Sequence, residues 1–372
     1  MSETSKSFKV LTEEILQKYA FVRCGACVGL FPYLKLFVGA IVFPDFCDLT
    51  DGRCLNFCPK GPVELDTVAR QSWNEAYTGS PLGHHLKIVM ARAADNPNAQ
   101  YGGIATTLAQ VAVSDEGLSG ALLTRWRDLS YPEGIIVDDP KDIPTYGGSH
   151  YAGAYTLAAL NRARKSNPEA FAVVGLPCQI LALRKMHSFN HPENPHQGKE
   201  DLLVGLFCTW GLSPRDFRTD MQRRFGNRKI VRYNIPPPPA NRLDVFFEDG
   251  EKIEIPLEEI RPFLNPGCGT CLDMTAEFAD ISVGAAEGFP GWNTVIIRSE
   301  KGQDLFDRLV REGTIETAPL PETSLQHLTG AAAMKKKKAL NVMDQEGVTS
   351  QTPTLPPEAR EAILNFQSSE EP

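Results

Sequence analysis

The sequence has no hydrophobic run long enough to cross a membrane. Its most apolar stretch, residues 28–43, is shorter than the roughly 20 residues that a spanning helix needs, and it contains Pro32 and Lys35. The first ten residues are polar and lack the apolar centre of a secretion signal. We therefore expect a cytoplasmic protein without a transmembrane segment.

An excess of positive charge is also absent. The net charge of the 372-residue chain is −8, so nothing in bulk offsets the repulsion from phosphates and we expect no binding of nucleic acid. No internal repeat of fixed period is present. The hydrophobic share of 42% and the charged share of 23% are typical of globular proteins, and the length allows two or three domains.

Disulfide bonds are not expected, although the chain has nine cysteines. No secretion signal precedes them, and an odd number leaves at least one thiol unpaired. Reduced cysteines that occur in groups indicate metal or iron–sulfur ligation instead.

The first group of cysteines combines Cys24-Gly-Ala-Cys27 with Cys47, Cys54 and Cys58. A Cys-x-x-Cys pair places two thiolates on one loop, and a cysteine followed by proline, as at Cys58, is typical of the end of a ferredoxin-type site. A leucine stands three residues after Cys27, where a bacterial ferredoxin has its third cysteine. We expect Cys24, Cys27, Cys54 and Cys58 to be ligands, with Cys47 as the spare or the substitute. A structural zinc site is the alternative.

The second group is dispersed and consists of Cys178, Cys208, Cys268 and Cys271. Cys178 stands between a strand-like and a helix-like run, and Cys208 ends another strand-like run. Because strand ends in an α/β sheet converge on one edge, both residues can meet the Cys268-x-x-Cys271 loop there. From spacing alone, Cys178 or Cys208 could also be an inert buried thiol, and Cys178 a reactive thiol of lowered pKa.

Strand-like and helix-like runs alternate from about residue 85 onward. Strands are expected at 121–123, 135–137, 171–175, 202–207, 281–284 and 294–298, a hairpin at 245–255, and helices at 8–19, 102–114, 154–165, 178–187 and 303–311. This alternation predicts an α/β fold with a mixed, partly parallel sheet. The expected units are an N-terminal helix and Cys-rich segment (1–80), an α/β domain (81–235), a smaller C-terminal α+β part (236–345) and a polar tail (346–372).

These motifs resemble the coenzyme F420 hydrogenase/dehydrogenase beta subunit family, which includes the plant 7-hydroxymethyl chlorophyll a reductase. The matching segments are RCGACVG (23–29), CLNFCP (54–59), YGGIATTLA (101–109), GGSHY (147–151), VGLPCQILALRK (174–185), GLFCTWGLSPRDF (205–217), PGCGTCLDMTAEFADISVG (266–284) and GWNTVIIRSEKG (291–302). The combination of PCQ, FCTW and the last cysteine motif is specific to this family. His150 departs from the pattern, since many relatives have Lys at that position.

The resemblance implies bound FAD and one or two [4Fe-4S] clusters. It also implies that Cys178, Cys208, Cys268 and Cys271 are ligands of the cluster beside the flavin. The hydride carrier would be F420, or NAD(P)H in a host without F420. Flavin is the chemical link, because it accepts two electrons as a hydride and releases them singly to clusters. The α/β sheet would then be a flavin-binding core that follows an N-terminal iron–sulfur segment.

Contacts with the flavin are expected from three segments. Two glycines before a helix allow close approach of the backbone, and a helix N-terminus attracts phosphate. The candidates are Gly102, Gly103, Thr106, Thr107, Ser149, His150, Tyr151, Gly175, Pro177 and Gln179.

The charged residues receive no catalytic role. Asp273, Glu277 and Asp280 are expected to be helix caps or solvated charges, and no pair of acids stands out for acid–base catalysis. The run Lys335–Lys338 is expected to be solvated, with docking of an acidic partner such as ferredoxin as the alternative.

Three functions compete on this basis. The first is an oxidoreductase subunit that passes electrons between the hydride carrier and a complex of hydrogenase, formate dehydrogenase or heterodisulfide-reductase-like subunits. The second is a stand-alone reductase that takes electrons from ferredoxin and reduces an organic substrate. The third is a non-enzymatic cluster or zinc scaffold.

Overall fold

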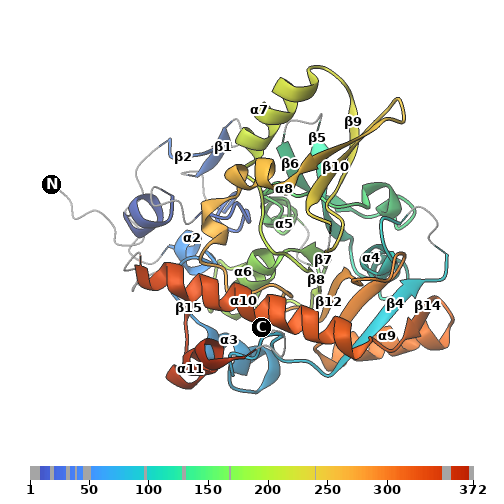
Figure 1. The fold of residues 1–372 in the computed structure, drawn as a ribbon. Helices are drawn as coiled ribbons and strands as arrows, with labels where there is room; N and C mark the ends of the chain where they lie inside the picture. Colours follow the sequence, from blue (N-terminus) through green and yellow to red (C-terminus); the bar gives the residue numbers. More distant parts are fainter. Residues whose placement is uncertain are drawn as a thin grey trace.

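The centre of the molecule is an eight-stranded mixed sheet (Figure 1). The computed structural model describes residues 9–16, 21–30, 34–37, 40–44, 52–95, 99–127, 131–166, 169–238, 240–345 and 353–367. The strand order is β14-β4-β13-β12-β8-β7-β5-β6. The strands are β4 (Lys87–Ala93), β5 (Ala121–Arg127), β6 (Tyr131–Val137), β7 (Ala172–Gly175), β8 (Leu202–Leu206), β12 (Ile281–Ala285), β13 (Asn293–Ile297) and β14 (Ile315–Ala318). Strands β12, β8, β7 and β5 pair in parallel and the others antiparallel, so the expected mixed α/β sheet is confirmed.

Helices cover both faces of this sheet. Successive side chains of a strand point to opposite faces: Leu203 packs in the apolar cluster of α6, whereas Leu202 and Val204 pack in that of α4. The first face carries α4 (Ile104–Ser114) and α9 (Glu300–Arg311). The second carries α3 (Leu65–Trp73), α5 (Leu157–Ala163), α6 (Pro177–Ser188), α10 (Glu322–Gln345) and α11 (Pro357–Asn365).

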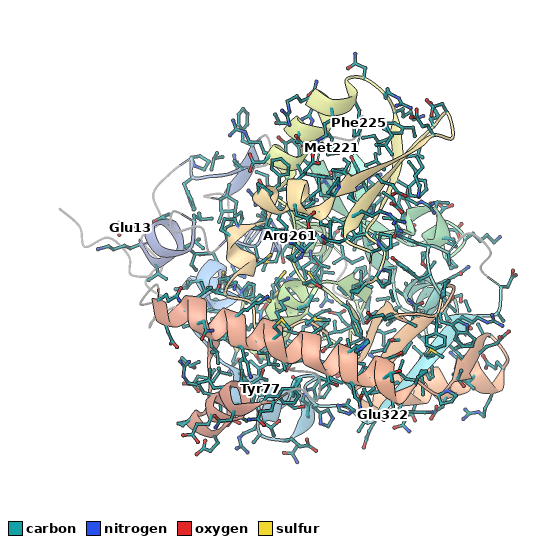
Figure 2. All side chains as sticks on the ribbon, in the orientation of Figure 1. Glu13, Tyr77, Met221, Phe225, Arg261 and Glu322 are labelled. Carbon is teal, nitrogen blue, oxygen red and sulfur yellow. The ribbon has the colours of Figure 1, made fainter. Side chains whose placement is uncertain are left out.

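A smaller antiparallel sheet, in the order β11-β10-β9, has an apolar cluster of its own. Its elements are β9 (Ile230–Asn234), β10 (Arg242–Phe247), β11 (Lys252–Pro256), α7 (Pro214–Phe225) and α8 (Leu257–Ile260). The expected hairpin is present, with Val245 opposite Ile253. Figure 2 shows Met221 and Phe225 on α7, and the Phe225 ring centroid lies 5.1 Å from that of Phe247.

The N-terminal segment has little regular structure. Its elements are η1 (Val10–Leu16), β1 (Lys35–Phe37), β2 (Ala40–Val42), α2 (Arg53–Asn56) and β3 (Val63–Glu64). Of the helix expected at 8–19, residues 9–16 are helical, and Leu11 and Ile15 pack against the cysteine-bearing segment. The rest of that expected helix lies outside the described residues.

Residues 353–367, which lie within the expected polar tail, are folded onto the rest of the molecule. Helix α10 crosses the molecule (Figure 1) and buries Ala332, Ala339 and Leu340. Strand β15 (Pro353–Thr354) pairs with β3, and α11 buries Ala359 and Ile363. The boundary expected at residue 235 also does not divide the main sheet, because β12, β13 and β14 join strands that precede it. No helix in the described ranges is long and apolar enough to cross a membrane.

The remaining short helices are η2 (Ile143–Tyr146), η3 (Arg261–Phe263) and η4 (Pro266–Cys268). The last of these carries Cys268 into the region where β7 and β8 end. Helix α5 is shorter than the 154–165 expected. Strands β5 and β6 are longer than the strands expected at 121–123 and 135–137, and they pair with each other in antiparallel fashion.

Candidate functional site

Four cysteines of the N-terminal segment converge in the interior. Cys24 and Cys27 lie on the loop at 21–30, Cys54 lies in α2, and Cys58 follows α2; all four are buried. Burial raises the pKa of the Cys27 thiol well above its ordinary value, and Cys24, Cys58 and Cys54 raise it further. The four thiols are therefore close enough to interact electrostatically. The predicted spare, Cys47, lies outside the described residues.

Helix α5 and the residues just before it hold the Cys24–Cys27 loop in place. The buried Asn161 side chain donates hydrogen bonds to the carbonyls of Ala26 (2.9 Å) and Val28 (2.7 Å). Gly25 has φ +88°, and a β-carbon there would lie 2.7 Å from the backbone of Tyr155, so a side chain would both strain and displace the loop. Sequence reasoning missed Asn161, because nothing local links it to cysteines more than a hundred residues away.

The second group also comes together. Cys178 is in the first turn of α6 directly after β7, Cys208 follows β8, and Cys268 and Cys271 lie at and just after η4. Burial raises the pKa of Cys178 well above its ordinary value, and Cys24, Cys271, Cys208 and Cys268 raise it further. Because Cys24 belongs to the first group, the two groups adjoin at Cys24 and Cys178.

Hydrogen bonds from backbone N–H groups hold two of these cysteines in position. The Gly211 N–H donates to Cys268 Sγ (3.3 Å), and the Cys208 N–H donates to the Met274 carbonyl (2.8 Å). Burial raises the pKa of Cys208 to about 12, against the opposing effect of the ammonium group of Lys335. As a free thiol, Cys208 would be neutral at physiological pH.

Three lysine ammonium groups point into the cysteine region. Lys60 Nζ donates to Thr270 Oγ1 (2.7 Å), and Lys185 Nζ donates to the carbonyls of Cys58 (2.5 Å) and Pro62 (3.1 Å). Lys335 Nζ donates to the carbonyls of Cys208 (2.6 Å) and Asp273 (2.7 Å). The expectation that the run Lys335–Lys338 is solvated is therefore wrong for Lys335, and also for Lys336, which is buried and pairs with Glu277.

The acidic residues near Cys271 are buried rather than solvated. Glu277 pairs with Lys336, and burial raises the pKa of Glu277 to about 6. Asp280 accepts hydrogen bonds from Arg184 Nη2 (3.0 Å) and the Leu203 N–H (2.8 Å). The expected solvated charge is wrong for both, because their partners come from distant segments. Asp273 does cap a turn, since its Oδ2 accepts from the Glu277 N–H (2.8 Å).

The spacing of the thiols bears on the kind of metal centre. Among the described residues, no three or more His, Cys, Asp or Glu side chains come close enough together to hold a single metal ion. A tetrahedral zinc site needs sulfurs at about 2.3 Å from one ion. A four-iron cluster instead offers a separate iron to each thiolate and so accepts sulfurs that are farther apart.

Two of the three candidate flavin segments lie side by side. The Ser149 N–H donates to Gln100 Oε1 (2.8 Å), and a β-carbon on Gly147 would lie 3.6 Å from Thr106 Oγ1. Gly103 caps α4 with φ +75°. Gly102 is packed against strand β4 of the main sheet, because a β-carbon there would lie 2.7 Å from the carbonyl oxygen of Ala91. Thr107 Oγ1 donates to the Gly103 carbonyl (3.2 Å).

His150 is the feature of this region that points to a ligand. Both ring nitrogens are buried, and within the described part of the chain neither makes a hydrogen bond of good geometry, although the Thr124 backbone lies near enough to oppose the lowering of the His150 pKa. The ring packs edge-on to Trp126 with centroids 6.0 Å apart. Burial lowers the pKa of His150 to about 4, so the imidazole is neutral. Beside it, Tyr151 Oη accepts from the Ile235 N–H (2.8 Å). An unpaired buried imidazole fits a bound group that carries donors or acceptors.

The third segment, Gly175, Pro177 and Gln179, shapes the turn that presents Cys178. Gln179 Oε1 accepts from the Leu176 N–H (2.8 Å), and Gln179 Nε2 donates to the Ala154 carbonyl (3.3 Å). Both ends of this buried amide are thus used within the protein. Pro177 is the first residue of α6, where its missing N–H costs nothing.

Two family models, both described as coenzyme F420 hydrogenase/dehydrogenase, match this chain. The model for the N-terminal part of the beta subunit matches residues 88–161, and the model for its C-terminal part matches residues 169–323. Together they cover more than half of the chain.

Known relatives agree with these models. The coenzyme F420 hydrogenase subunit beta of Methanothermobacter thermautotrophicus is 29% identical over 69% of this chain and 94% of its own length. The coenzyme F420-dependent sulfite reductase of Methanocaldococcus jannaschii is 28% identical over 81% of this chain, which spans about half (48%) of that protein. A chain of the F420-reducing [NiFe] hydrogenase complex from Methanosarcina barkeri superposes with a TM-score of 0.65 at 25% identity, covering 74% of this chain and 97% of that one. The resemblance seen in the motifs is confirmed: this protein belongs to the coenzyme F420 hydrogenase/dehydrogenase beta subunit family.

Proposed function

We propose that this protein is an iron–sulfur flavoprotein subunit of an F420-linked oxidoreductase. It would pass electrons between coenzyme F420 and the [4Fe-4S] clusters of a partner complex by way of FAD. The observation that carries the proposal is the convergence of eight cysteines, from five separate segments, into two adjoining groups. Relatives that are named for F420 support this carrier over NAD(P)H.

The two groups supply the ligands of two clusters. Cys24, Cys27, Cys54 and Cys58 would hold the first, and Cys178, Cys208, Cys268 and Cys271 the second. Burial raises the pKa of Cys24, Cys27, Cys178 and Cys208 and so disfavours their free thiolates, whereas bound iron requires thiolates and stabilises them.

Residues around the N-terminus of α4 would hold the flavin. Bound FAD supplies the exchange between a two-electron hydride and single electrons. Ser149 and the neutral His150 offer polar contacts, and Trp126 and Tyr151 supply aromatic surface. The N-terminus of α4 would attract a phosphate through the N–H groups that follow Ile104, because the Ile104 N–H itself donates to Asn293 Oδ1 (3.2 Å). The tight packing of Gly102 against β4 fixes where this helix begins.

The adjacency of Cys24 and Cys178 supports transfer of electrons between the two groups. Cys178 lies at the carboxyl end of β7, in the part of the sheet where ligands of open α/β folds bind. A path from a flavin at this edge to the N-terminal segment then needs no further carrier.

Anaerobic purification tests the proposal. We expect a yellow-brown protein with bound flavin and about four to eight irons per chain, as one or two cubane clusters require. A colourless protein that contains zinc would contradict it.

The partner is tested by purification from the native host. We propose a hydrogenase-type partner, as in the complex from Methanosarcina barkeri to which the fold is similar. Stable co-purification with hydrogenase, formate dehydrogenase or heterodisulfide-reductase-like subunits is the expected result. A lone chain that is active with reduced ferredoxin and an organic substrate would favour the stand-alone reductase instead.

A further inference from the structure

We propose that Lys60, Lys185 and Lys335 are positioning residues that raise the reduction potentials of the two clusters, each lysine acting on one specified cluster. Lys185 would act on the N-terminal cluster, and Lys60 and Lys335 on the second. The inference rests on the proposed function, because it assumes that the cysteine groups hold iron. It goes beyond that function by assigning a role to three residues that ligate nothing.

The lysines are distributed in a crossed pattern. Lys60 follows Cys58 of the first group by two residues, yet its Nζ reaches Thr270, between the two cysteines of the second group. Lys185 lies on α6 together with Cys178 of the second group, yet its Nζ binds the carbonyl of Cys58 in the first. A segment that carries cysteines of one group therefore also carries a lysine whose ammonium group lies beside the other group.

Lys335 approaches the second group from α10. Its ammonium group bridges the carbonyl of Cys208, itself a proposed ligand, and that of Asp273, which lies just after Cys271 in the chain.

The three cations lack close carboxylate partners. Lys60 and Lys185 are buried and Lys335 is half-buried, and within the described ranges no Asp or Glu oxygen lies within 4.0 Å of their ammonium nitrogens. Lys336, the next residue on α10, shows the contrast, because it pairs with Glu277. Buried charges in proteins are paired, and under this proposal the loaded cysteine groups supply the counter-charge for the three lysines.

A fixed positive charge beside a cluster favours the reduced form. Reduction adds one negative charge to the cluster, and the attraction between that charge and an ammonium group is strong in a buried site. Net charge and hydrogen bonding around the cluster are established determinants of its potential. Removing one ammonium group should therefore make the nearby cluster harder to reduce, and the distant one much less so.

The test is an anaerobic redox titration of the loaded full-length protein, followed by EPR. The variants are Lys335→Met, Lys60→Met and Lys185→Met, which keep an apolar side chain of similar length. Lys338→Met is the matched control, because Lys338 is exposed on the same helix and in the same lysine run. Lys335→Arg restores the charge.

We expect group-specific shifts. At the ambient potential where the wild-type second cluster is half reduced, Lys335→Met and Lys60→Met should lower its reduced-to-oxidised ratio about tenfold, which is about 59 mV for a one-electron couple. Lys185→Met should shift the N-terminal cluster in the same sense. Lys338→Met should shift neither, and Lys335→Arg should recover most of the wild-type potential.

The outcomes separate the two proposals. A wild-type protein without iron would refute the proposed function itself. Iron and flavin at wild-type levels with unchanged potentials in the Met variants, or an equal shift in Lys338→Met, would overturn only the role of the lysines. If Lys335→Met loses its iron, Lys60→Met and Lys185→Met decide the question by the same criterion. Loss of iron from all three would show that the lysines hold the clusters rather than set their potentials, and would also overturn the inference.

Discussion

Replacement of Lys336 by Met should destabilise the protein strongly and in a pH-dependent way. Lys336 and Glu277 are both almost fully buried and form an ion pair, and Lys336 Nζ also donates to Tyr77 Oη (2.8 Å). Figure 2 shows Tyr77 beneath α10. Removal of one partner of a buried pair leaves an uncompensated charge, which costs about 3–5 kcal/mol.

The pH dependence follows from the pKa of Glu277. Burial raises this pKa to about 6, the ammonium group of Lys336 opposes that rise, Asp273 adds to it and Arg298 opposes it. A raised carboxyl pKa gives stability that is present below the unfolded-state value and is lost as the pH rises through the folded-state value. Without Lys336 the pKa of Glu277 rises further, so the loss extends to higher pH, at up to about 1.4 kcal/mol per pH unit.

Urea unfolding of the anaerobic holoprotein at about pH 5 and about pH 8 measures the effect. We expect Lys336→Met to be more destabilising at the higher pH. The double variant Glu277→Gln, Lys336→Met should recover much of the lost free energy, because it buries no unpaired charge. Equal destabilisation at both pH values, or a double variant no more stable than the single one, would refute this reasoning.

Three further predictions concern the cysteine groups. Cys271→Ser should lower the iron content and remove the second cluster while leaving the EPR signal of the N-terminal cluster, and unchanged iron content would rule out the assignment. Cys47→Ser should leave the iron content intact, and loss of a whole cluster would show that Cys47 is a ligand. Asn161→Ala should remove the hydrogen bonds to Ala26 and Val28, at a cost of about 1–3 kcal/mol for carbonyls left buried. Chelators should then extract iron from the N-terminal cluster faster than from the wild type, whereas an unchanged extraction rate would mean that the loop is held by other contacts.

Local signals in the sequence predicted most of the elements that position the site. The Gly102-Gly103 pair marks the start of α4, and the apolar runs at 171–175 and 202–207 mark β7 and β8. These signals can be recognised in the sequence because helix caps and the alternation of side chains along a strand depend on residues that are neighbours in the chain. Because Cys178 and Cys208 each follow the end of a strand, and strand ends of an α/β sheet converge on one edge, the sequence also predicted that these two residues lie close together.

The burial of charged side chains could not be predicted from such local patterns. The expectation of solvated charge failed at Glu277, Asp280 and Lys335, because each is stabilised by groups that are distant in sequence. The amide of the buried Gln179, a candidate flavin contact, hydrogen-bonds within its own turn and to the Ala154 carbonyl. Sequence patterns could not predict these partners either.

By itself, the sequence determined the family, the alternation of strands and helices, and the two groups of cysteines that are proposed to hold iron, because all three depend on local patterns of residues. The tertiary structure decided which ions are buried and what neutralises them. The free energy of a buried charge depends on the groups within a few ångströms in space, and in this protein those groups come from both ends of the chain.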